Sequence, residues 1–296
     1  MSQTAAGTAA ELIGESDLDR AVDEAATCLG VDPHHSNLFE ISFESPGIAR
    51  AARPGEFAQI LVDEGPIPLL RRPFSFSRAD PDSGLVAFYL GAVGAGSSRL
   101  RRFRPGDRAR ILGPLGRGFS LPDSPGRSIV VGGGLGAAPF PLLIDRLIST
   151  GEEVVWINGA RSGHELYPER LLPQGITELV IRTEDGSRGE RGLVTDGLAQ
   201  RLAAAQRLYA CGPNPMLAAV AALWREQRAK GGPVPPLEVS IEAPMGCGFG
   251  TCLGCAVPLR AGDHPGPFGL CCRQGPVLAA DSLDWERLLT QPAHLG

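Results

Sequence analysis

The cysteines of this chain are concentrated in one stretch, where five of the seven lie between residues 247 and 272. Three of them, Cys247, Cys252 and Cys255, follow the spacing C-x4-C-x2-C. This is the spacing of a plant-type [2Fe-2S] binding loop, whose fourth thiolate comes from further along the chain. Four glycines at residues 246–254 allow the sharp bends and positive φ angles that wrapping a small cluster requires. The chain is therefore predicted to fold around an iron–sulfur cluster near its C-terminus.

Other interpretations of these cysteines remain open at this point. A structural zinc site also takes four cysteines, but its ligands usually come in C-x2-4-C pairs. A second pair exists here only if the adjacent Cys271 and Cys272 both bind. Disulfide bonds or unliganded thiols are a further alternative. If the segment around Cys271 and Cys272 is extended, as we expect, neighbouring side chains point in opposite directions and only one of the two reaches the cluster.

The composition narrows the class of protein. Acidic residues outnumber basic ones, with 33 Asp and Glu against 28 Lys and Arg, which argues against nucleic acid as a partner. No apolar run approaches the length of about 20 residues that spans a bilayer, so we expect no membrane insertion. The acid-rich N-terminus has no basic signal segment. Clustered cysteines in such a chain favour metal binding in a reducing compartment, and predict a cytoplasmic protein.

The first half of the chain divides into two segments. Residues 1–30 are rich in alanine and acidic residues and are predicted to be an extension, with a short amphipathic helix around residues 18–29. Residues 31–125 contain short stretches of period-two hydrophobicity separated by turn residues, which predicts a small antiparallel β-barrel or sandwich. We expect its strands at residues 38–43, 57–62, 74–77, 85–90 and 108–112, and one helix near residues 98–103.

After residue 125 the pattern changes to apolar strands that alternate with helical sequence. Such alternation makes a parallel, doubly wound sheet. Residues 126–236 are therefore predicted to form an α/β domain, and residues 237–296 a small C-terminal segment that carries the cysteines. The expected strands cover residues 128–131, 154–157, 178–181, 208–211 and 237–242, and a helix is expected over residues 137–148.

Two strands of the α/β domain end in turns suited to a nucleotide. Residues 132–136 follow the first strand and open a helix, so their backbone N–H groups make a site for a pyrophosphate. Residues 211–213 form a similar turn after a later strand. The first turn is not a complete G-x-G-x-x-G, so a packing role alone is the alternative. The residues that we expect at the dinucleotide are Gly133, Gly134, Gly136, Cys211, Gly212 and Pro213.

Residues 72–75 of the barrel place a cation, a rigid turn residue, an aromatic ring and a hydroxyl side by side. Arg72 could bind the phosphates of a flavin, and Ser75 could approach its ring. Gly96 and Ser97 lie just before the expected helix and offer a second phosphate cradle. Each pattern also occurs in ordinary hairpin turns, so neither identifies a flavin site by itself. The candidate residues are Arg72, Pro73, Phe74, Ser75, Gly96 and Ser97.

Taken together, these stretches resemble the ferredoxin-reductase superfamily, in which a flavin-binding barrel precedes a nicotinamide-binding domain. Within it the chain is most similar to the electron transfer subunits of NAD-dependent (class B) dihydroorotate dehydrogenase, which carry FAD and a [2Fe-2S] cluster. The resemblance covers residues 53–277, most of the chain. Its specific pieces are residues 53–57, 72–75, 96–97, 113–119, 132–139, 183–187 and 211–213, together with the cysteine loop at residues 244–255.

The resemblance implies roles for individual residues. It places FAD against residues 72–75, with Ser75 near the flavin ring, and the pyrophosphate of FAD at Gly96 and Ser97. The chain departs from the family at Ser97, where threonine is usual, and at Phe74, where an aliphatic residue is common. Ser97 keeps the hydroxyl, so we expect binding to survive. The resemblance also implies that the cofactor is lined by the backbone of Leu90, Gly91 and Ala92.

The resemblance further distinguishes the two adjacent cysteines. In the family the last cysteine directly precedes a short run that ends in Gly-Pro-Val, which selects Cys272 over Cys271 as the fourth ligand. The cofactor preference is less clear, because Arg161 follows the second strand of the α/β domain, where an arginine can receive the 2′-phosphate of NADP. The resemblance implies NAD instead.

The implied function is a relay of electrons between the FMN of a dihydroorotate-oxidising partner and NAD⁺, through the [2Fe-2S] cluster and FAD, in pyrimidine biosynthesis. The partner would be the FMN-containing catalytic subunit, in a heterotetramer. An alternative with the same scaffold is the flavin/iron–sulfur subunit of a sulfide dehydrogenase, hydrogenase or NADPH–ferredoxin oxidoreductase complex. No side chain is predicted to act as a catalytic acid or base, because hydride transfer is the chemistry of the cofactor.

Overall fold

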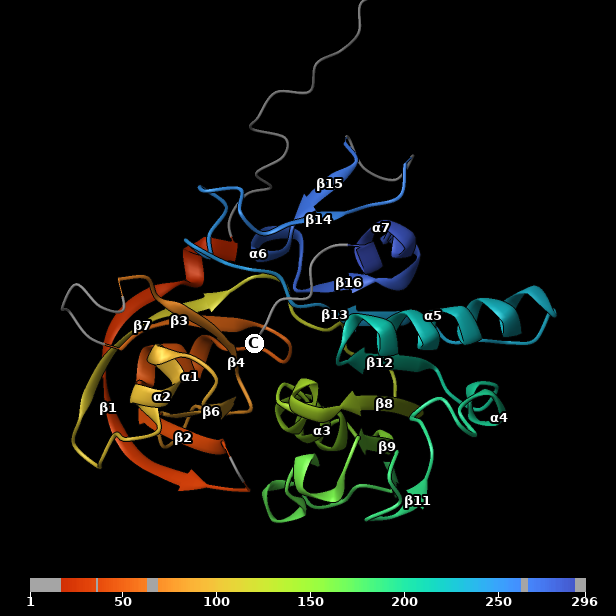
Figure 1. The fold of residues 1–296 in the computed structure, drawn as a ribbon, viewed down its shortest axis with the longest axis horizontal. Helices are drawn as coiled ribbons and strands as arrows, with labels where there is room; N and C mark the ends of the chain where they lie inside the picture. Colours follow the sequence, from red (N-terminus) through yellow and green to blue (C-terminus); the bar gives the residue numbers. More distant parts are fainter. Residues whose placement is uncertain (1–16, 36, 63–68, 262–265, 291–296) are drawn as a thin grey trace, which may run out of the picture.

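The computed structural model describes residues 17–35, 37–62, 69–261 and 266–290 (Figure 1). Within these residues two seven-stranded sheets lie side by side, and a small two-stranded sheet adjoins them. The first sheet is antiparallel and curled, and the second is mainly parallel with helices packed on it. The predicted combination of an antiparallel barrel with a doubly wound α/β domain is confirmed.

The antiparallel sheet and its two short helices comprise β1 (Val22–Pro33), β2 (Leu38–Glu44), α1 (Pro46–Ala51), β3 (Phe57–Leu61), β4 (Arg72–Ser75), β5 (Arg78–Asp80), β6 (Leu85–Gly91), α2 (Ala95–Leu100) and β7 (Arg108–Leu115). The strand order is β4-β3-β7-β1-β2-β6-β5. Phe39, Ile41 and Phe43 alternate along β2 and point into the core, where Phe88 and Ile111 join them. The period-two pattern in the sequence is therefore the pattern of core contacts.

The structure corrects the prediction for residues 18–29. They do not form one amphipathic helix. A single 3-10 turn (Asp17–Arg20) is followed by the strand β1, which pairs with β2 and β7. Ala26 and Cys28, two residues apart, are buried against the barrel core. Cross-strand pairing and this burial outweigh the helix propensity of the alanines. The barrel thus begins inside the predicted extension, of which residues 1–16 lie outside the described residues.

The second sheet and its helices comprise β8 (Arg127–Gly133), η2 (Gly134–Ala137), α3 (Phe140–Ser149), β9 (Glu153–Ala160), β10 (Glu178–Thr183), β11 (Glu190–Arg191), α4 (Ala199–Leu202), β12 (Arg207–Cys211), α5 (Asn214–Ala229), β13 (Leu237–Ser240) and β16 (Val277–Ala279). The strand order is β11-β10-β9-β8-β12-β13-β16, and all neighbours are parallel except β13 and β16. The order reverses between β8 and β12. Ligands of such sheets bind at this switch point, outside the carboxyl ends of the strands.

Both faces of the parallel sheet are covered, which explains why its strands read as continuous apolar runs. Val130 of β8 packs with Leu143 of α3 on one face. Ile129 and Val131 pack on the other face with Val220 of α5. The helices expected near residues 98–103 and 137–148 are present as α2 and α3 with shifted bounds.

The C-terminal segment is built into the parallel sheet, because β13 and β16 extend that sheet beyond β12. Between them come the cysteine loop, the hairpin of β14 (Ala256–Pro258) and β15 (Phe268–Leu270), and α6 (Cys271–Gln274); α7 (Trp285–Thr290) follows β16. The expectation that the segment around Cys271 is extended is wrong, since these residues form one helical turn. In the described part of the chain, no helix has the length and apolar character needed to cross a membrane.

Candidate functional site

The two glycine-containing turns of the α/β domain meet at the switch point of the parallel sheet. The last residue of β12, Cys211, pairs with Gly132 near the end of β8. The backbones of Gly136 and Gly212 lie so close together that a Cβ on Gly136 would be 2.6 Å from the backbone nitrogen of Gly212. Only glycine fits this approach. The two turns, predicted separately, form one continuous backbone surface at the N-terminus of α5.

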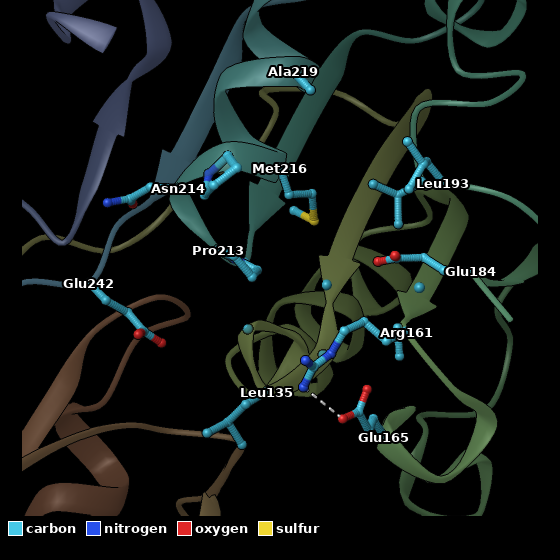
Figure 2. A pocket seen from close by; sticks show the side chains of 18 of the residues that line it. Leu135, Arg161, Glu165, Glu184, Leu193, Pro213, Asn214, Met216, Ala219 and Glu242 are labelled. Atoms are coloured by element: carbon cyan, nitrogen blue, oxygen red, sulfur yellow. Dashed lines mark hydrogen bonds and ion pairs between the residues drawn. The ribbon is translucent and has the colours of Figure 1, made fainter. Parts of the chain in front are cut away.

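A cavity of about 1010 Å³ opens at these turns (Figure 2). Figure 2 shows Pro213 and Met216 facing Leu135 and Arg161 across it. Gly91 of the barrel strand β6 also lines it, so the cavity lies between the barrel and the α/β domain. Its volume is at the upper end of the range for small-molecule sites, about 300–1,000 Å³. The size and position suit part of a dinucleotide. The predicted residues that line it are Gly133, Gly134, Gly136, Gly212 and Pro213.

Cys211 does not line the cavity with the other predicted residues. Its side chain is 5% exposed, and burial raises the pKa of its thiol to about 12. The thiol therefore stays protonated and packs beneath the turn.

The far end of the cavity, at the ends of β9 and β10, is acidic. Nη2 of Arg161 lies 3.0 Å from Oε1 of Glu165, as the dashed line in Figure 2 shows. Glu184 lines the same end. Two carboxylates beside one guanidinium favour a ribose hydroxyl over an added phosphate, because carboxylates accept hydrogen bonds from hydroxyls and repel phosphate.

The barrel brings two of the predicted flavin motifs together. A Cβ on Gly96 would lie 3.1 Å from Nε of Arg72, so the arginine side chain rests on the start of α2. The Ser97 hydroxyl accepts hydrogen bonds from the backbone N–H groups of Val93 and Gly94, at 3.1 and 3.2 Å. These bonds hold the turn that precedes α2. Guanidinium and turn together form a polar surface that fits a phosphate group.

The remaining flavin candidates differ in accessibility. Leu90 is 3% exposed in the barrel core, so only its backbone can meet a cofactor. Ala92 is partly buried against the same core, and Gly91 lines the cavity. Phe74 packs against the barrel core rather than standing free. All four residues of the motif on β4 are half-buried: Arg72, Pro73, Phe74 and Ser75.

The structure brings the predicted cysteine ligands together as two pairs. The Sγ atoms of Cys255 and Cys272 lie 3.1 Å apart. The backbone N–H of Cys252 donates to Sγ of Cys247 at 3.4 Å. Across the residues that the structure describes, no three His, Cys, Asp or Glu side chains are arranged to hold one metal ion. A [2Fe-2S] cluster has two irons and four thiolates, so two pairs suit it better than zinc, which needs four sulfurs around one ion.

One sulfur of each pair, that of Cys247 and that of Cys255, has surroundings that favour the thiolate, the form that binds metals, whereas the hydrogen bond to Cys255 raises the pKa of Cys272. The hydrogen bond from Cys272 lowers the pKa of Cys255 to about 6, and the backbone N–H of Cys272 contributes at 3.4 Å. Burial raises the pKa of Cys247, but hydrogen bonds from the backbone N–H groups of Cys252 and Phe249 outweigh it and bring the pKa to about 7.

Cys271 points away from the other cysteines. Its Sγ donates to the backbone carbonyl of Ile241 at 3.6 Å, and burial raises the pKa of its thiol. Cys272, on the same helical turn, faces Cys255 instead. The one-turn helix α6 therefore separates the two side chains that spacing alone could not distinguish.

The backbone of the cysteine loop has the bends that its glycines predicted. Gly248 and Gly250 have φ angles of 83° and 93°. Leu253 has a φ of 59°, the one positive value at a non-glycine residue of the described chain. With its N–H groups directed at Cys247, and with its three cysteines and Cys272 of α6 in two pairs, the loop fits a [2Fe-2S] cluster as its resident group.

Several residues at the cavity were not predicted. Met216, at the start of α5, fills the space between Gly133 and Gly212, and its position one helical turn after Gly212 was an available signal. Glu242 and Leu289 also line the cavity. They reach the cavity because the C-terminal segment folds back on the α/β domain. No local pattern in the sequence predicts this fold-back.

Comparison with known proteins agrees with this geometry. Residues 242–284 match the model of the iron–sulfur cluster binding domain of dihydroorotate dehydrogenase B, and residues 130–222 match the oxidoreductase NAD-binding domain. Relatives from Desulforamulus reducens and Geobacillus thermodenitrificans are 35% and 37% identical to this chain. The alignments cover 84% and 82% of this chain, and 94% and 91% of the relatives. Both are described as the electron transfer subunit of dihydroorotate dehydrogenase B (NAD(+)).

Solved structures share the fold. A structure of NADH-dependent reduced ferredoxin–NADP oxidoreductase matches 90% of this chain and 92% of its own, with a TM-score of 0.77 and 25% identity. The ferredoxin reductase of carbazole 1,9a-dioxygenase matches 72% of this chain and 67% of its own, with a TM-score of 0.59 and 23% identity. By identity and coverage, the chain belongs to the family of electron transfer subunits of NAD⁺-dependent dihydroorotate dehydrogenase B.

Proposed function

We propose that this chain carries electrons between a dihydroorotate-oxidising partner and NAD⁺, and that it binds a [2Fe-2S] cluster, FAD and NAD for this purpose. The names of its relatives support the proposal, because an electron transfer subunit implies a separate catalytic subunit. The match of residues 242–284 to the cluster-binding domain of dihydroorotate dehydrogenase B supports the same partner class over the alternatives with a similar scaffold. The reaction belongs to pyrimidine biosynthesis.

The observation that supports this proposal is that the three candidate sites adjoin one another. Gly248 of the cysteine loop contacts Gln59 on β3. β3 pairs with β4, which carries Arg72 and the flavin motif. Gly91, on another strand of the same barrel, lines the cavity of the nucleotide turns. The cysteine loop thus adjoins the strand next to the flavin motif, and the nucleotide cavity lies against the same barrel.

The assignment of residues follows this order. Four thiolates hold the cluster, and the flavin lies against residues 72–75, 90–92 and 96–97. The dinucleotide lies at residues 132–136 and 211–213. The cluster supplies one-electron exchange and FAD supplies one- or two-electron exchange, which together join a one-electron donor to a hydride carrier. The cluster ligands are Cys247, Cys252, Cys255 and Cys272.

The division of the chain is also a proposal. We place the flavin-binding barrel before residue 125, the NAD-binding domain at residues 126–236 and the cluster segment at residues 237–296. The start of β1 moves the beginning of the barrel to Val22.

We propose that the partner is an FMN-containing catalytic subunit and that the two chains form a heterotetramer. The exposure of the cysteine loop supports contact with a partner at this end of the molecule. Cys252 is exposed, and beside it Leu253 is 63% exposed and Phe249 39% exposed. Apolar side chains exposed together on a surface mark sites of protein interaction.

The test is coexpression of this chain with the FMN-containing dihydroorotate dehydrogenase of the same organism, followed by anaerobic purification. We expect copurification and dihydroorotate-dependent reduction of NAD⁺. Cys252→Ser is expected to abolish that turnover, because its thiol is a proposed ligand. Cys28→Ala, in the barrel core away from the loop, is the control that should retain it.

Failure to bind this partner would change the proposed partner but not the proposed cofactors. If the chain held FAD and the cluster but neither bound that partner nor supported the reaction, the fold would stand and the pathway would fail. The sulfide dehydrogenase, hydrogenase and NADPH–ferredoxin oxidoreductase complexes would then be the partners to test.

A further inference from the structure

Gln59 is a polar side chain buried between the barrel and the cysteine loop. It lies in the middle of β3 and is 0% exposed. Its strand neighbours Ala58 and Ile60 belong to the barrel core. Phe57, two residues away on the same face as Gln59, packs in the cluster that contains Cys255 and Cys272. The side chain of Gln59 therefore points out of the barrel, toward the cysteines.

Both polar atoms of this carboxamide, Nε2 and Oε1, have no hydrogen-bond partner among the described residues. Leaving a buried amide unpaired costs about 1–3 kcal/mol, so such groups in folded proteins normally have a partner. A hydrophobic residue would fill the same space without that cost. The position of Gln59 thus calls for a partner that is not a side chain or backbone group of this chain.

The cysteine loop approaches Gln59 at Gly248, the residue after Cys247. A Cβ on Gly248 would lie 2.5 Å from Nε2 of Gln59, so the loop approaches the amide at a position where only glycine fits. Gly248 has a φ of 83°, which also favours glycine. Two separate features of the chain, a glycine with positive φ and a buried amide, therefore meet at the wall of the proposed cluster site.

We propose that the Nε2–H of Gln59 donates a hydrogen bond to a sulfur atom of the cluster site, either a ligand thiolate or a sulfide of the cluster. This inference rests on the proposed [2Fe-2S] site. A donor at the sulfurs stabilises the reduced, more negative cluster more than the oxidised cluster, and so raises its reduction potential. Gln59 also pairs with Pro73 in the flavin motif, so the same residue connects the cluster wall to the flavin strand.

The test is the reduction potential of the cluster in the full chain, measured by a redox titration followed by electron paramagnetic resonance. Gln59→Met keeps the size of the side chain and removes the donor. We expect the ratio of reduced to oxidised cluster at a fixed potential to fall about tenfold, which is about 59 mV for a one-electron couple. The resonance of the reduced cluster should shift as well, a change that activity alone would not reveal.

Gln206→Met is the matched control, because Gln206 is also a glutamine with a structural role but lies just before β12, at the amino ends of the parallel strands. Its Nε2 donates to the Ser124 carbonyl at 2.9 Å and to the Glu152 carboxylate at 2.8 Å. This variant loses stability through those bonds and should leave the potential of the cluster unchanged. A shift common to both variants would therefore count against a hydrogen bond from Gln59.

Gln59→Glu keeps the shape of the side chain. It provides a second test of the inference if the methionine variant does not load the cluster. At alkaline pH, where the new carboxyl is ionised, its negative charge beside the sulfurs should lower the potential below that of the wild type. An unchanged potential in a cluster-loaded Gln59→Met or Gln59→Glu protein overturns the inference and leaves the proposed function intact. A wild-type protein with FAD but no [2Fe-2S] resonance overturns both.

Discussion

The nucleotide turns and the cysteine loop differ in how completely the protein alone shapes them. At the turns, Gly136 and Gly212 already touch, and a cavity of about 1010 Å³ lies beside them. In the cysteine loop the sulfurs form two pairs, and in the described chain no three ligand side chains surround one point. The first site is therefore held by close backbone packing, whereas the second depends on where a loop and one helical turn place their sulfurs.

The difference follows from the elements that carry each site. The turns join strands in the middle of a parallel sheet to helices packed on both of its faces, so their backbone has little freedom. The loop between β13 and β14 has no regular structure, and its conformation depends on glycines with positive φ. Sites on regular elements are held more firmly than sites on loops, and metal ligands on loops are ordered by the metal itself.

The largest expected effect is the loss of one site without the other. In Cys255→Ser we expect complete loss of the [2Fe-2S] resonance and of electron transfer from the partner, because one thiolate of the buried pair is missing. NADH should still bind within about twofold of the wild type, since distant sites are energetically independent within about 0.3–0.5 kcal/mol. Anaerobic absorbance and resonance spectra measure the first effect, and an NADH titration of the bound flavin measures the second.

The control for this variant is Cys271→Ser. Cys271 is a buried cysteine of the same region, but α6 directs its side chain away from Cys255, whereas it directs Cys272 toward Cys255. The Cys271 thiol donates to the carbonyl of Ile241, and a serine hydroxyl can do the same. We expect this variant to keep its cluster. A cluster that survives in Cys255→Ser and is lost in Cys271→Ser would show that the ligand assignment is wrong.

The reciprocal change breaks the nucleotide site. A valine at position 136 would press its side chain against the backbone of Gly212, where neither partner can move. Overpacking of this kind costs about 1–3 kcal/mol, so we expect Gly136→Val to weaken NADH binding about 10- to 100-fold. The cluster resonance should be unchanged. A variant that lost the cluster together with NADH binding would contradict the independence of the two sites.

The sequence predicted those elements whose local pattern agrees with their place in the fold. The strand β2 shows period-two hydrophobicity because alternate residues enter the core, and β6 and β8 are continuous apolar runs because both of their faces are covered. β1 was missed because its alanines and acidic residues read locally as helix. Its strand conformation comes from pairing with β2, the next strand in the chain, and with β7, which lies far away in sequence.

The candidate sites divide in the same way. The spacing of the cysteines and the glycines of the turns are local patterns, and both could be recognised in the sequence. The direction of Cys271 depends on the helical turn α6, and the position of Glu242 at the cavity depends on the return of the C-terminal segment. Gln59 gives no signal at all, since a glutamine in a strand carries no information until the cysteine loop is placed beside it.

A smaller effect should separate the backbone of the cysteine loop from its ligands. Gly248→Ala adds a Cβ where φ is 83° and Gln59 is 2.5 Å away, which costs about 1–2 kcal/mol in backbone strain alone. We expect the cluster to form but to be lost to a chelator about 5- to 30-fold faster. Gly232→Ala is the control, because a Cβ there would meet nothing closer than 3.6 Å. Equal rates in the two variants would show that the loop tolerates a side chain at residue 248.

The smallest effect tests the acidic end of the nucleotide cavity. In the pair of Arg161 and Glu165 the arginine side chain is 80% exposed and the glutamate 29%, and solvent-exposed pairs contribute about 0.2–1 kcal/mol. Glu165→Gln removes a negative charge and releases the guanidinium, so it can meet a 2′-phosphate. We therefore expect the ratio of kcat/KM for NADPH to that for NADH to rise up to about fivefold, with the cluster unaffected. The gain should vanish in Glu165→Gln combined with Arg161→Gln, because the cation that receives the phosphate is then absent. If the double variant kept the gain, the loss of repulsion by the carboxylate would be sufficient, and Arg161 would have no part in the choice between the two dinucleotides.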